Sequence, residues 1–184
     1  MAMQSDPVKL NGNAKIVSVK LPDTVTELGN SCFNNCPALA QVRLSEGLTK
    51  IPDTCFQQCG LQEIVIPEGV TIIGRSAFNG CSGLTGSLVI PDGVTSIGSF
   101  AFATSENLVT ITIPEHVTNI DAGAFKYCYN LSKIEVDENN LSGESTAAKL
   151  GLDPAVMASP FISTIVDALS LLIYFLFATL LLGI

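Results

Sequence analysis

The sequence predicts a β-rich solenoid of about five to six turns with short parallel strands, followed by a single C-terminal transmembrane α-helix. A phenylalanine recurs at intervals of 22 to 24 residues, and a threonine recurs at the same intervals. A period of this length is typical of solenoids, in which each repeat packs its apolar side chains against its neighbours. The phenylalanines are Phe33, Phe56, Phe78, Phe102 and Phe125, and the threonines are Thr26, Thr49, Thr71, Thr95 and Thr118.

Residues 61–81 show how one repeat is built. Ile64 and Ile66 alternate with Glu63 and Val65, which is the period-two pattern of a short strand with one apolar face. Pro67 ends this strand because proline has no backbone N–H to donate to a neighbour. The next two residues are typical of a turn, after which the chain returns to the core. Stacked repeats would place equivalent residues about 4.8 Å apart, in continuous apolar columns.

Six cysteines follow the same repeat. Two pairs, Cys32–Cys36 and Cys55–Cys59, have a spacing similar to that of metal ligands, so a zinc site is one interpretation. The repeat favours another: four cysteines lie three residues after a phenylalanine, and the other two occupy positions filled by alanine elsewhere. Free cysteine behaves as a small apolar residue. We therefore predict buried, unpaired thiols, which fit a reducing compartment better than an oxidising one.

The full pattern, Leu-x-x-Ile-x-Ile-Pro-x-x-Val-Thr-x-Ile-Gly-x-x-Ala-Phe-x-x-Cys, resembles the leucine-rich repeat of BspA-type, or Treponema-type, proteins. Five copies match it between residues 16 and 140. The resemblance implies a leucine-rich-repeat solenoid that mediates protein or surface contacts, often adhesion, and that is not an enzyme. Many members of that family are secreted, whereas the first residues here lack the basic and apolar regions of a secretory signal.

Composition and residue patterns exclude several classes of function. The net charge is −8, and nine scattered Lys and Arg residues make no patch that could neutralise phosphates, which argues against nucleic-acid binding. His116 is the only histidine, and it replaces the turn glycine of its repeat. No Ser/His/Asp set, phosphate-binding glycine loop or pair of acids can be assembled around it. We therefore expect no enzymatic activity and no cofactor in the solenoid.

Outward positions of the predicted strands form the surface on which we expect a protein partner to bind. This face is polar, with a small apolar patch at Val65 and Val89. Solenoids commonly bind partners through such an extended face, and an ordinary solvated face is the alternative interpretation. The candidate positions are Lys20, Gln41, Arg43, Glu63, Val65, Val89 and Thr112.

A carboxylate follows the end of the first strand in each turn. Because oxygen ligands suit Ca²⁺ and Mg²⁺, one hypothesis is that this column concentrates divalent cations or a basic partner. The alternative is a row of solvated turn residues, whose charges salt screens over about 8 Å. The column is Asp23, Glu46, Glu68, Asp92, Glu115 and Glu138.

The C-terminal residues have a different composition. Residues 168–184 contain no charged side chain, and Asp167 is the only one between Pro160 and Ile184. A bilayer core of about 30 Å is crossed by about 20 helical residues, so this segment is long enough to span it. We therefore expect a single-pass membrane protein whose repeat domain lies on the cytoplasmic side.

Residues 149–184 also resemble the last transmembrane helix of MgtE-type magnesium transporters. The Asp-Pro-Ala at 153–155, the Pro-Phe-x-x-Thr at 160–164, Asp167 and the Ile-Tyr-Phe at 173–175 occur in the order of that family. The resemblance implies that Asp153, and secondarily Asp167, lies near a Mg²⁺ path. The alternative function is therefore a component or fragment of such a transporter, with other transporter helices or a homo-oligomer as partners. The remaining pore helices and cytoplasmic domains of that family are missing from this chain.

These patterns divide the chain into four parts. We predict an N-terminal extension over residues 1–15, the solenoid over 16–140, a linker over 141–152 and the MgtE-like helix over 153–184. The function we expect is that of a non-enzymatic, membrane-anchored module for protein–protein interaction.

Overall fold

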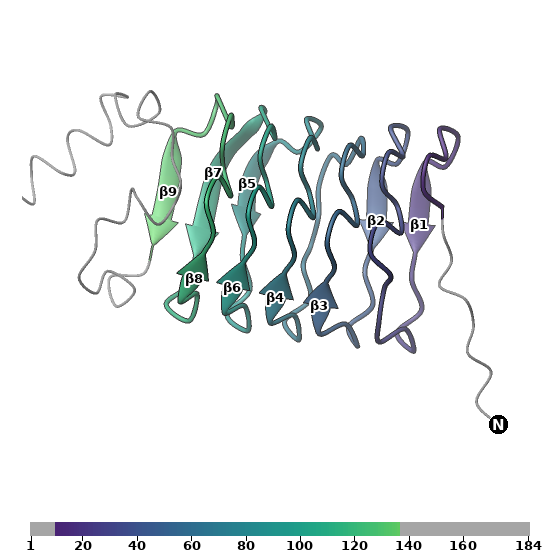
Figure 1. Cartoon of the computed structure of the whole chain (residues 1–184), viewed down its shortest axis with the longest axis horizontal. Helices are drawn as coiled ribbons and strands as arrows, with labels where there is room; N and C mark the ends of the chain where they lie inside the picture. Colours follow the sequence, from purple (N-terminus) through teal and green to yellow (C-terminus); the bar gives the residue numbers. More distant parts are fainter. Residues whose placement is uncertain (1–9, 137–184) are drawn as a thin grey trace, which may run out of the picture. The chain divides into compact units, whose positions relative to one another are not determined.

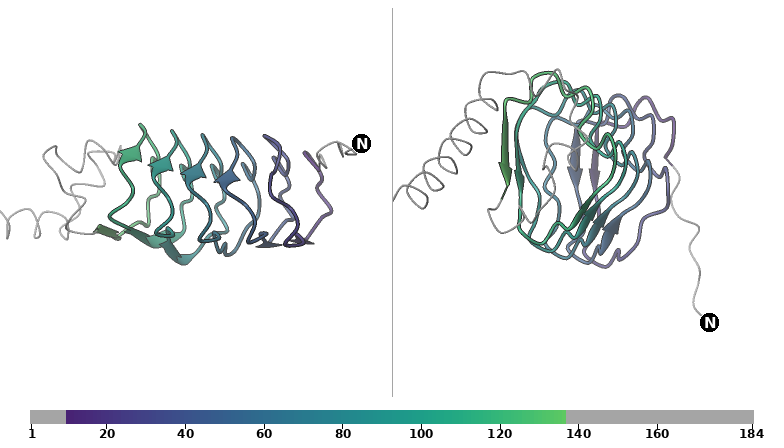
Figure 2. Two further views of the ribbon diagram at one scale, coloured as in Figure 1. Left: turned by 90° about the horizontal axis from the view of Figure 1, so that it is seen from below. Right: turned by 60° about the vertical axis from the view of Figure 1, so that its left-hand side comes forward.

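The computed structural model describes residues 10–136, and this part of the chain contains nine short strands and no helix (Figure 1). The strands are β1 (Ser18–Lys20), β2 (Gln41–Arg43), β3 (Lys50–Ile51), β4 (Ile72–Ile73), β5 (Gly86–Val89), β6 (Ser96–Ile97), β7 (Leu108–Ile113), β8 (Asn119–Ile120) and β9 (Lys133–Val136). They belong to five stacked turns and the first strand of a sixth, β9, and successive turns lie side by side (Figure 2). The predicted solenoid with short parallel strands is confirmed.

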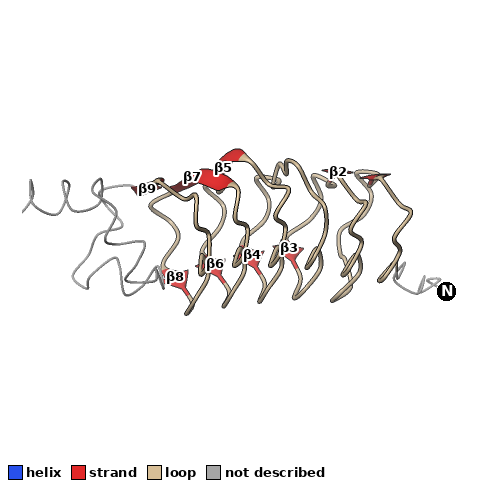
Figure 3. Ribbon diagram, turned by 90° about the horizontal axis from the view of Figure 1, so that it is seen from above, coloured by secondary structure: helices blue, strands red, loops and turns tan. Residues whose placement is uncertain are grey.

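Two sides of the stack carry parallel sheets (Figure 3). One side holds the first strands of all turns except the third, in a two-stranded sheet β1-β2 and a three-stranded sheet β5-β7-β9. The opposite side holds the four-stranded sheet β3-β4-β6-β8. All pairs are parallel, and apart from a shift between Gly86 and Ser87 they are in register, so each repeat position forms a column along the stack. This second sheet was not predicted as strands, because two-residue strands are too short to show an alternating pattern.

The core is built around the phenylalanine column. The five rings stack face to face, with neighbouring centroids 5.2–5.6 Å apart and ring planes within 4–8° of parallel. The backbone supports the stack, because the N–H of each of the first four phenylalanines donates to the next turn, as Phe78 N does to Ala101 O at 2.7 Å. Isoleucine, leucine and valine columns from both sheets surround the rings and are buried with them.

The chain turns sharply on both sides of each phenylalanine. The residues two positions before and two positions after it have positive φ, between 52° and 75°. Glycine fills only two of these ten positions, Gly80 and Gly123. A non-glycine residue in this conformation costs about 1–2 kcal/mol. Hydrogen bonds between turns offset this cost, because the conformation directs backbone amide groups towards the next repeat. Gln58 N, for example, donates to Asn79 O at 2.7 Å.

The third turn departs from the predicted pattern. Residues 63–66, predicted as a strand from their alternation, form none, and no backbone N–H among them donates a hydrogen bond. The loop before them is one residue shorter than in the preceding turn, and Gly60 packs against the backbone of Pro37. The fourth turn has one residue more, which is absorbed as a bulge at Gly86 with φ of 73°. The sheet of first strands is therefore interrupted between β2 and β5.

The predicted transmembrane helix and linker, together with Asp153 and Asp167, lie outside the described residues. Among residues 10–136, the structure contains no helix with the length and apolar character that crossing a bilayer requires.

Candidate interaction surface

The predicted binding positions share one exposed face of the solenoid. We call this the strand face, defined by the outward side chains of β1, β2, β5, β7 and β9 together with Glu63 and Val65 of the third turn. Val65 is 80% exposed and Val89 62% exposed, and they occupy the same position in successive turns, so together they form an apolar patch. Of the seven predicted positions, only Thr112 is half-buried and the other six are exposed.

Strand register brings some of these side chains together and leaves others apart. Lys20 lies beside Arg43 across β1 and β2, and Val89 lies beside Thr112 across β5 and β7. Val65 belongs to the same column but lies in the interrupted third turn, without a ladder on either side. The face is therefore a row of pairs held by backbone hydrogen bonds, with its most exposed apolar residue at the break.

Ion pairs order both ends of the strand face. At the first end, the Arg43 guanidinium contacts both carboxylate oxygens of Asp23, each at 3.3 Å. At the last end, the Thr112 hydroxyl donates to Glu135 Oε2 at 3.0 Å, and Lys133 forms an ion pair with the same carboxylate. The hydrogen bond from Lys133, the one from Thr112 and the charge of Lys133 together lower the pKa of Glu135. These contacts hold the charged groups in place without burying them.

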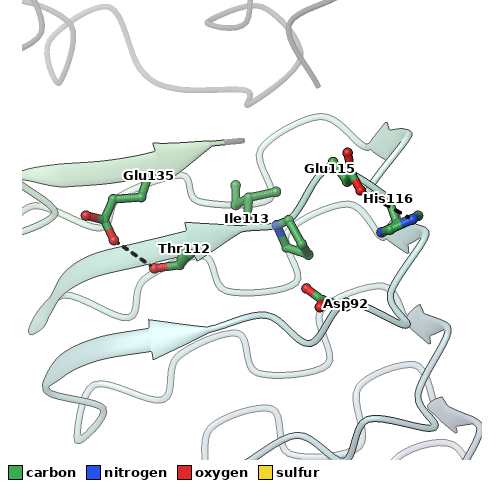
Figure 4. Close-up of a pocket in the computed structure, with 7 residues that line it drawn as sticks. Asp92, Thr112, Ile113, Glu115, His116 and Glu135 are labelled. Carbon is green, nitrogen blue, oxygen red and sulfur yellow. Dashed lines mark hydrogen bonds and ion pairs between the residues drawn. The ribbon is translucent and has the colours of Figure 1, made fainter. Parts of the chain in front are cut away.

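A shallow pocket of about 420 Å³ lies where strands β5 and β7 end (Figure 4). Ile113 and Pro114 line it with Asp92, Thr112, Glu115, His116 and Glu135. His116 Nε2 lies 3.7 Å from Glu115 Oε1, and both side chains are solvent-exposed. Two members of the predicted carboxylate column, Asp92 and Glu115, therefore border this pocket, and Asp23, Glu46 and Glu68 are likewise exposed. Glu138 lies outside the described residues.

No set of three His, Cys, Asp or Glu side chains between residues 10 and 136 is arranged to hold a metal ion. This applies to the two CxxxC pairs and to the five described members of the carboxylate column, which follow successive turns along the stack.

All six thiols are free and buried, as predicted. The column three residues after each phenylalanine has a role that the sequence did not show, because its side chains donate hydrogen bonds to the backbone of the preceding turn. Cys59 Sγ donates to Phe33 O at 3.0 Å, and Cys81 Sγ donates to Phe56 O at 3.1 Å. Ser105 fills the same position in the fourth turn, and its hydroxyl donates to Phe78 O. The position therefore selects a small side chain with a donor.

Burial makes the thiols of Cys55, Cys59, Cys81 and Cys128 poor nucleophiles. Loss of solvent raises the pKa of Cys59 to about 12 and that of Cys128 to about 11. The pKa values of Cys55 and Cys81 are raised further, again chiefly by burial. Because the thiolate is the reactive and metal-binding form, these side chains are structural in the folded protein.

The repeat, its in-register columns and its phenylalanine spine are matched by a known family. The family model described as a BspA type leucine rich repeat region, found in six copies, matches residues 10–132 and 84–148. The chain belongs to the BspA-type leucine-rich repeat family. This decides the architecture and agrees with the resemblance seen in the sequence.

Solved structures agree with the BspA-type assignment. The leucine rich repeat protein of T. pallidum is 34% identical with a TM-score of 0.66, and the match covers 72% of this chain and 60% of that one. A leucine-rich repeat protein from Bacteroides ovatus is also 34% identical, with a TM-score of 0.64 over 67% of this chain and 32% of that one. The pneumococcal vaccine antigen PcpA is 26% identical, with a TM-score of 0.62 over 70% and 33%. The chain thus spans 60% of the first protein and about a third of the other two.

A second family model, described as a divalent cation transporter and named MgtE, matches residues 145–177. This confirms the second resemblance, over residues that lie outside the described part of the BspA-type chain. No protein of curated function matches the chain.

Two exposed apolar residues of the BspA-type solenoid were missed by sequence reasoning. Val17 is 59% exposed and Val109 is 41% exposed, each next to the start of a first strand. Each lies two residues before the first apolar residue of the Ile-x-Ile pattern in its repeat, Val19 or Ile111. Alternation predicts an inward side chain at that position, so the repeat pattern could not have found them.

Proposed function

We propose that the BspA-type solenoid is a non-enzymatic binding module that contacts a protein partner through its strand face. The observation that carries this proposal is the pair of exposed valines, Val65 and Val89, near the middle of the face. Covering an exposed aliphatic side chain contributes about 1.5–3 kcal/mol. Residues that dominate binding energy tend to lie at the centre of an interface, with polar residues around them.

Rigidity also supports binding at this face. Neighbouring strands hold Val89 beside Thr112 in a backbone ladder, and the ion pairs of Arg43 and Glu135 fix both ends. A partner that covers Val89 and Thr112 therefore meets side chains that lose little freedom on binding, which lowers the entropic cost of association.

The test places a photo-crosslinking amino acid at position 65 of the full chain, in the cells that produce it. Position 72 is the matched control, because Ile72 is an exposed apolar residue, 40% accessible, on the opposite sheet. We expect a crosslinked protein adduct from position 65 and none from position 72. Equal adducts from both positions, or none from position 65, would contradict the proposal.

The second part of the proposal is that residues 153–184 anchor the module in a membrane as a single span, with the solenoid on the cytoplasmic side. The length of the uncharged segment supports this. The full chain should stay in the membrane fraction through alkaline extraction, whereas a variant lacking residues 149–184 should be released. In sealed inside-out vesicles, protease should digest the solenoid, and its protection would place it on the other side.

A second candidate function is that of a component of an MgtE-like magnesium transporter. The match of residues 145–177 to that family favours it, together with Asp153 and Asp167, which would lie near the Mg²⁺ path. An acid inside a bilayer generally faces other helices or an ion path. Crosslinking and native mass analysis of Asp167→Leu in membranes separate the two functions. A plain anchor tolerates the change, whereas a transporter helix loses its oligomer and its Mg²⁺ uptake.

A further inference from the structure

One column of the strand face changes character along the stack. It is basic in the first two turns, apolar in the next two, and polar and then acidic in the last two. In-register pairing links Lys20 to Arg43 at one end and joins Val89, Thr112 and Glu135 at the other. In order, the column reads Lys20, Arg43, Val65, Val89, Thr112 and Glu135.

This order is complementary to itself when reversed. A two-fold axis along the strand direction, between the third and fourth turns, would lay the first turn of one copy on the sixth of another. Lys20 would then face Glu135 of the second copy, and Val65 would face Val89. We propose that the strand face binds a second copy of this chain in this antiparallel, two-fold arrangement. The proposal rests on the proposed function, because it names the partner of the same face.

The contacts of the terminal charges fit such a dimer. Lys20 is exposed and forms no ion pair with any residue between 10 and 136. Glu135 is exposed too, but its carboxylate is held on the face by the Thr112 hydroxyl and by Lys133. The dimer would give Lys20 a counter-ion twice, because a two-fold interface repeats each contact.

A partner for this face must carry an acid and a base about 24 Å apart, which is five turn spacings, with apolar side chains between them. The reversed face supplies all three in order, which makes a second copy the best match in charge. The carboxylates that follow the strands of both copies would lie at the same edge of the interface. Salt screens the repulsion between them over about 8 Å. Six rows about 4.8 Å apart, each only a few residues long, cover less than the roughly 800 Å² per partner of a standard interface, so a weak dimer is expected.

Charge reversal tests the pairing in the full chain, purified in a mild detergent and followed by sedimentation velocity up to about 100 µM, a range that reports weak dimers. Lys20→Glu or Glu135→Lys should each weaken self-association about tenfold, because each change acts twice in the dimer. The double variant should restore it to within about threefold of the original. Lys50→Glu, a reversal at an exposed lysine on the opposite sheet, should change nothing.

Because Glu135→Lys places two lysines on β9, Glu135→Gln is a second variant that keeps the shape of the side chain, and about a threefold weakening is expected. A monomer throughout the concentration range would overturn the proposal. So would a dimer that ignores both reversals, or one that the double variant does not restore. Crosslinking at position 65 separates the dimer from the broader proposed function. Adducts with other proteins, without any adduct of twice the chain mass, would overturn the dimer and leave a different protein as the partner of the strand face.

Discussion

The thiol of Cys59 hydrogen-bonds to the carbonyl oxygen of Phe33, 26 residues earlier, with Sγ and O 3.0 Å apart. The bond ties two successive turns through a side chain beside the phenylalanine stack. It recurs in every turn, from Cys36 to Leu10 O, Cys81 to Phe56 O, Ser105 to Phe78 O and Cys128 to Phe102 O. The cysteine column is therefore part of the hydrogen-bonding of the fold.

Removing this donor should destabilise the solenoid. Cys59→Ala loses the bond to Phe33 and leaves a buried carbonyl without that partner, at an expected cost of about 1–3 kcal/mol. Cys59→Ser keeps a donor of the kind found at Ser105 and should cost less. Urea unfolding followed by circular dichroism measures both. Equal losses of unfolding free energy in the alanine and serine variants would show that only the volume of the sulfur atom matters.

The middle of the phenylalanine stack should be the most sensitive point of the core. Phe78 is fully buried, with its ring centroid 5.4 Å from that of Phe56 and 5.2 Å from that of Phe102. Phe78→Ala should cost about 3–5 kcal/mol through lost burial and the cavity left behind. Phe33→Ala should cost less, because that ring stacks against Phe56 alone among the described residues. The urea midpoints of the two variants compare them directly.

Gly123 should not tolerate a side chain while Phe100 is present. Its φ is 70°, and a Cβ would come within 2.7 Å of the Phe100 ring. Gly123→Ala should therefore cost more than the roughly 1–2 kcal/mol of a left-handed alanine. Adding Phe100→Ala should recover the part of the stability loss that comes from the steric clash and leave the part that comes from the positive φ. A double-mutant cycle with additive losses would show that the ring moves away without cost.

Alkaline pH should weaken the fold in proportion to its buried thiols. Folding raises the pKa of Cys128 to about 11 and raises that of Cys81, whereas thiols in the unfolded chain ionise near about 8.5. The stabilisation is complete below the unfolded pKa and is lost as the pH rises towards the folded value. Each such thiol lowers the free energy of unfolding by about 1.4 kcal/mol per pH unit between the unfolded and folded pKa values. Unfolding by urea at pH 7.5, 9 and 10 measures the slope.

The same burial predicts slow labelling of the native protein. At pH 8 in buffer, a thiol reagent should modify few of the six cysteines, and in denaturant it should modify all six within minutes. Rapid labelling of the native chain would mean that the turns open far more often than the packing indicates.

Periodicity made most of the fold predictable. Phe33 and its four equivalents specify the spine, and alternation around Ile111 and Ile113 specifies outward Thr110 and Thr112. The exposed valines of the strand face could be predicted for the same reason, because alternation assigns each residue to one side of the sheet. The family followed from the same columns.

The third turn could not be predicted, because its sequence matches the strand pattern as well as any other. Whether Ile64 and Ile66 join a ladder depends on the loop before them and on the bulge at Gly86 after them, which shift the backbones of neighbouring turns. The Cys59 hydrogen bond was also hidden, because a small apolar position and a small donor position look alike where cysteine fills both. The ion pair of Arg43 with Asp23 depends on side-chain rotamers that no repeat pattern specifies.

The interruption at residues 63–66 has a mechanical consequence. The sheet β3-β4-β6-β8 runs unbroken past the third turn, whereas the opposite side has no ladder there. Because hydrogen-bonded strands join the turns on only one side at this point, the solenoid should bend there more easily than elsewhere. Amide hydrogens of residues 63–66 should therefore exchange early. The solenoid should behave as two stiff segments joined by a flexible turn. Flexing there would change the separation of Val65 from Val89, so a partner seated on both valines would stiffen the whole rod.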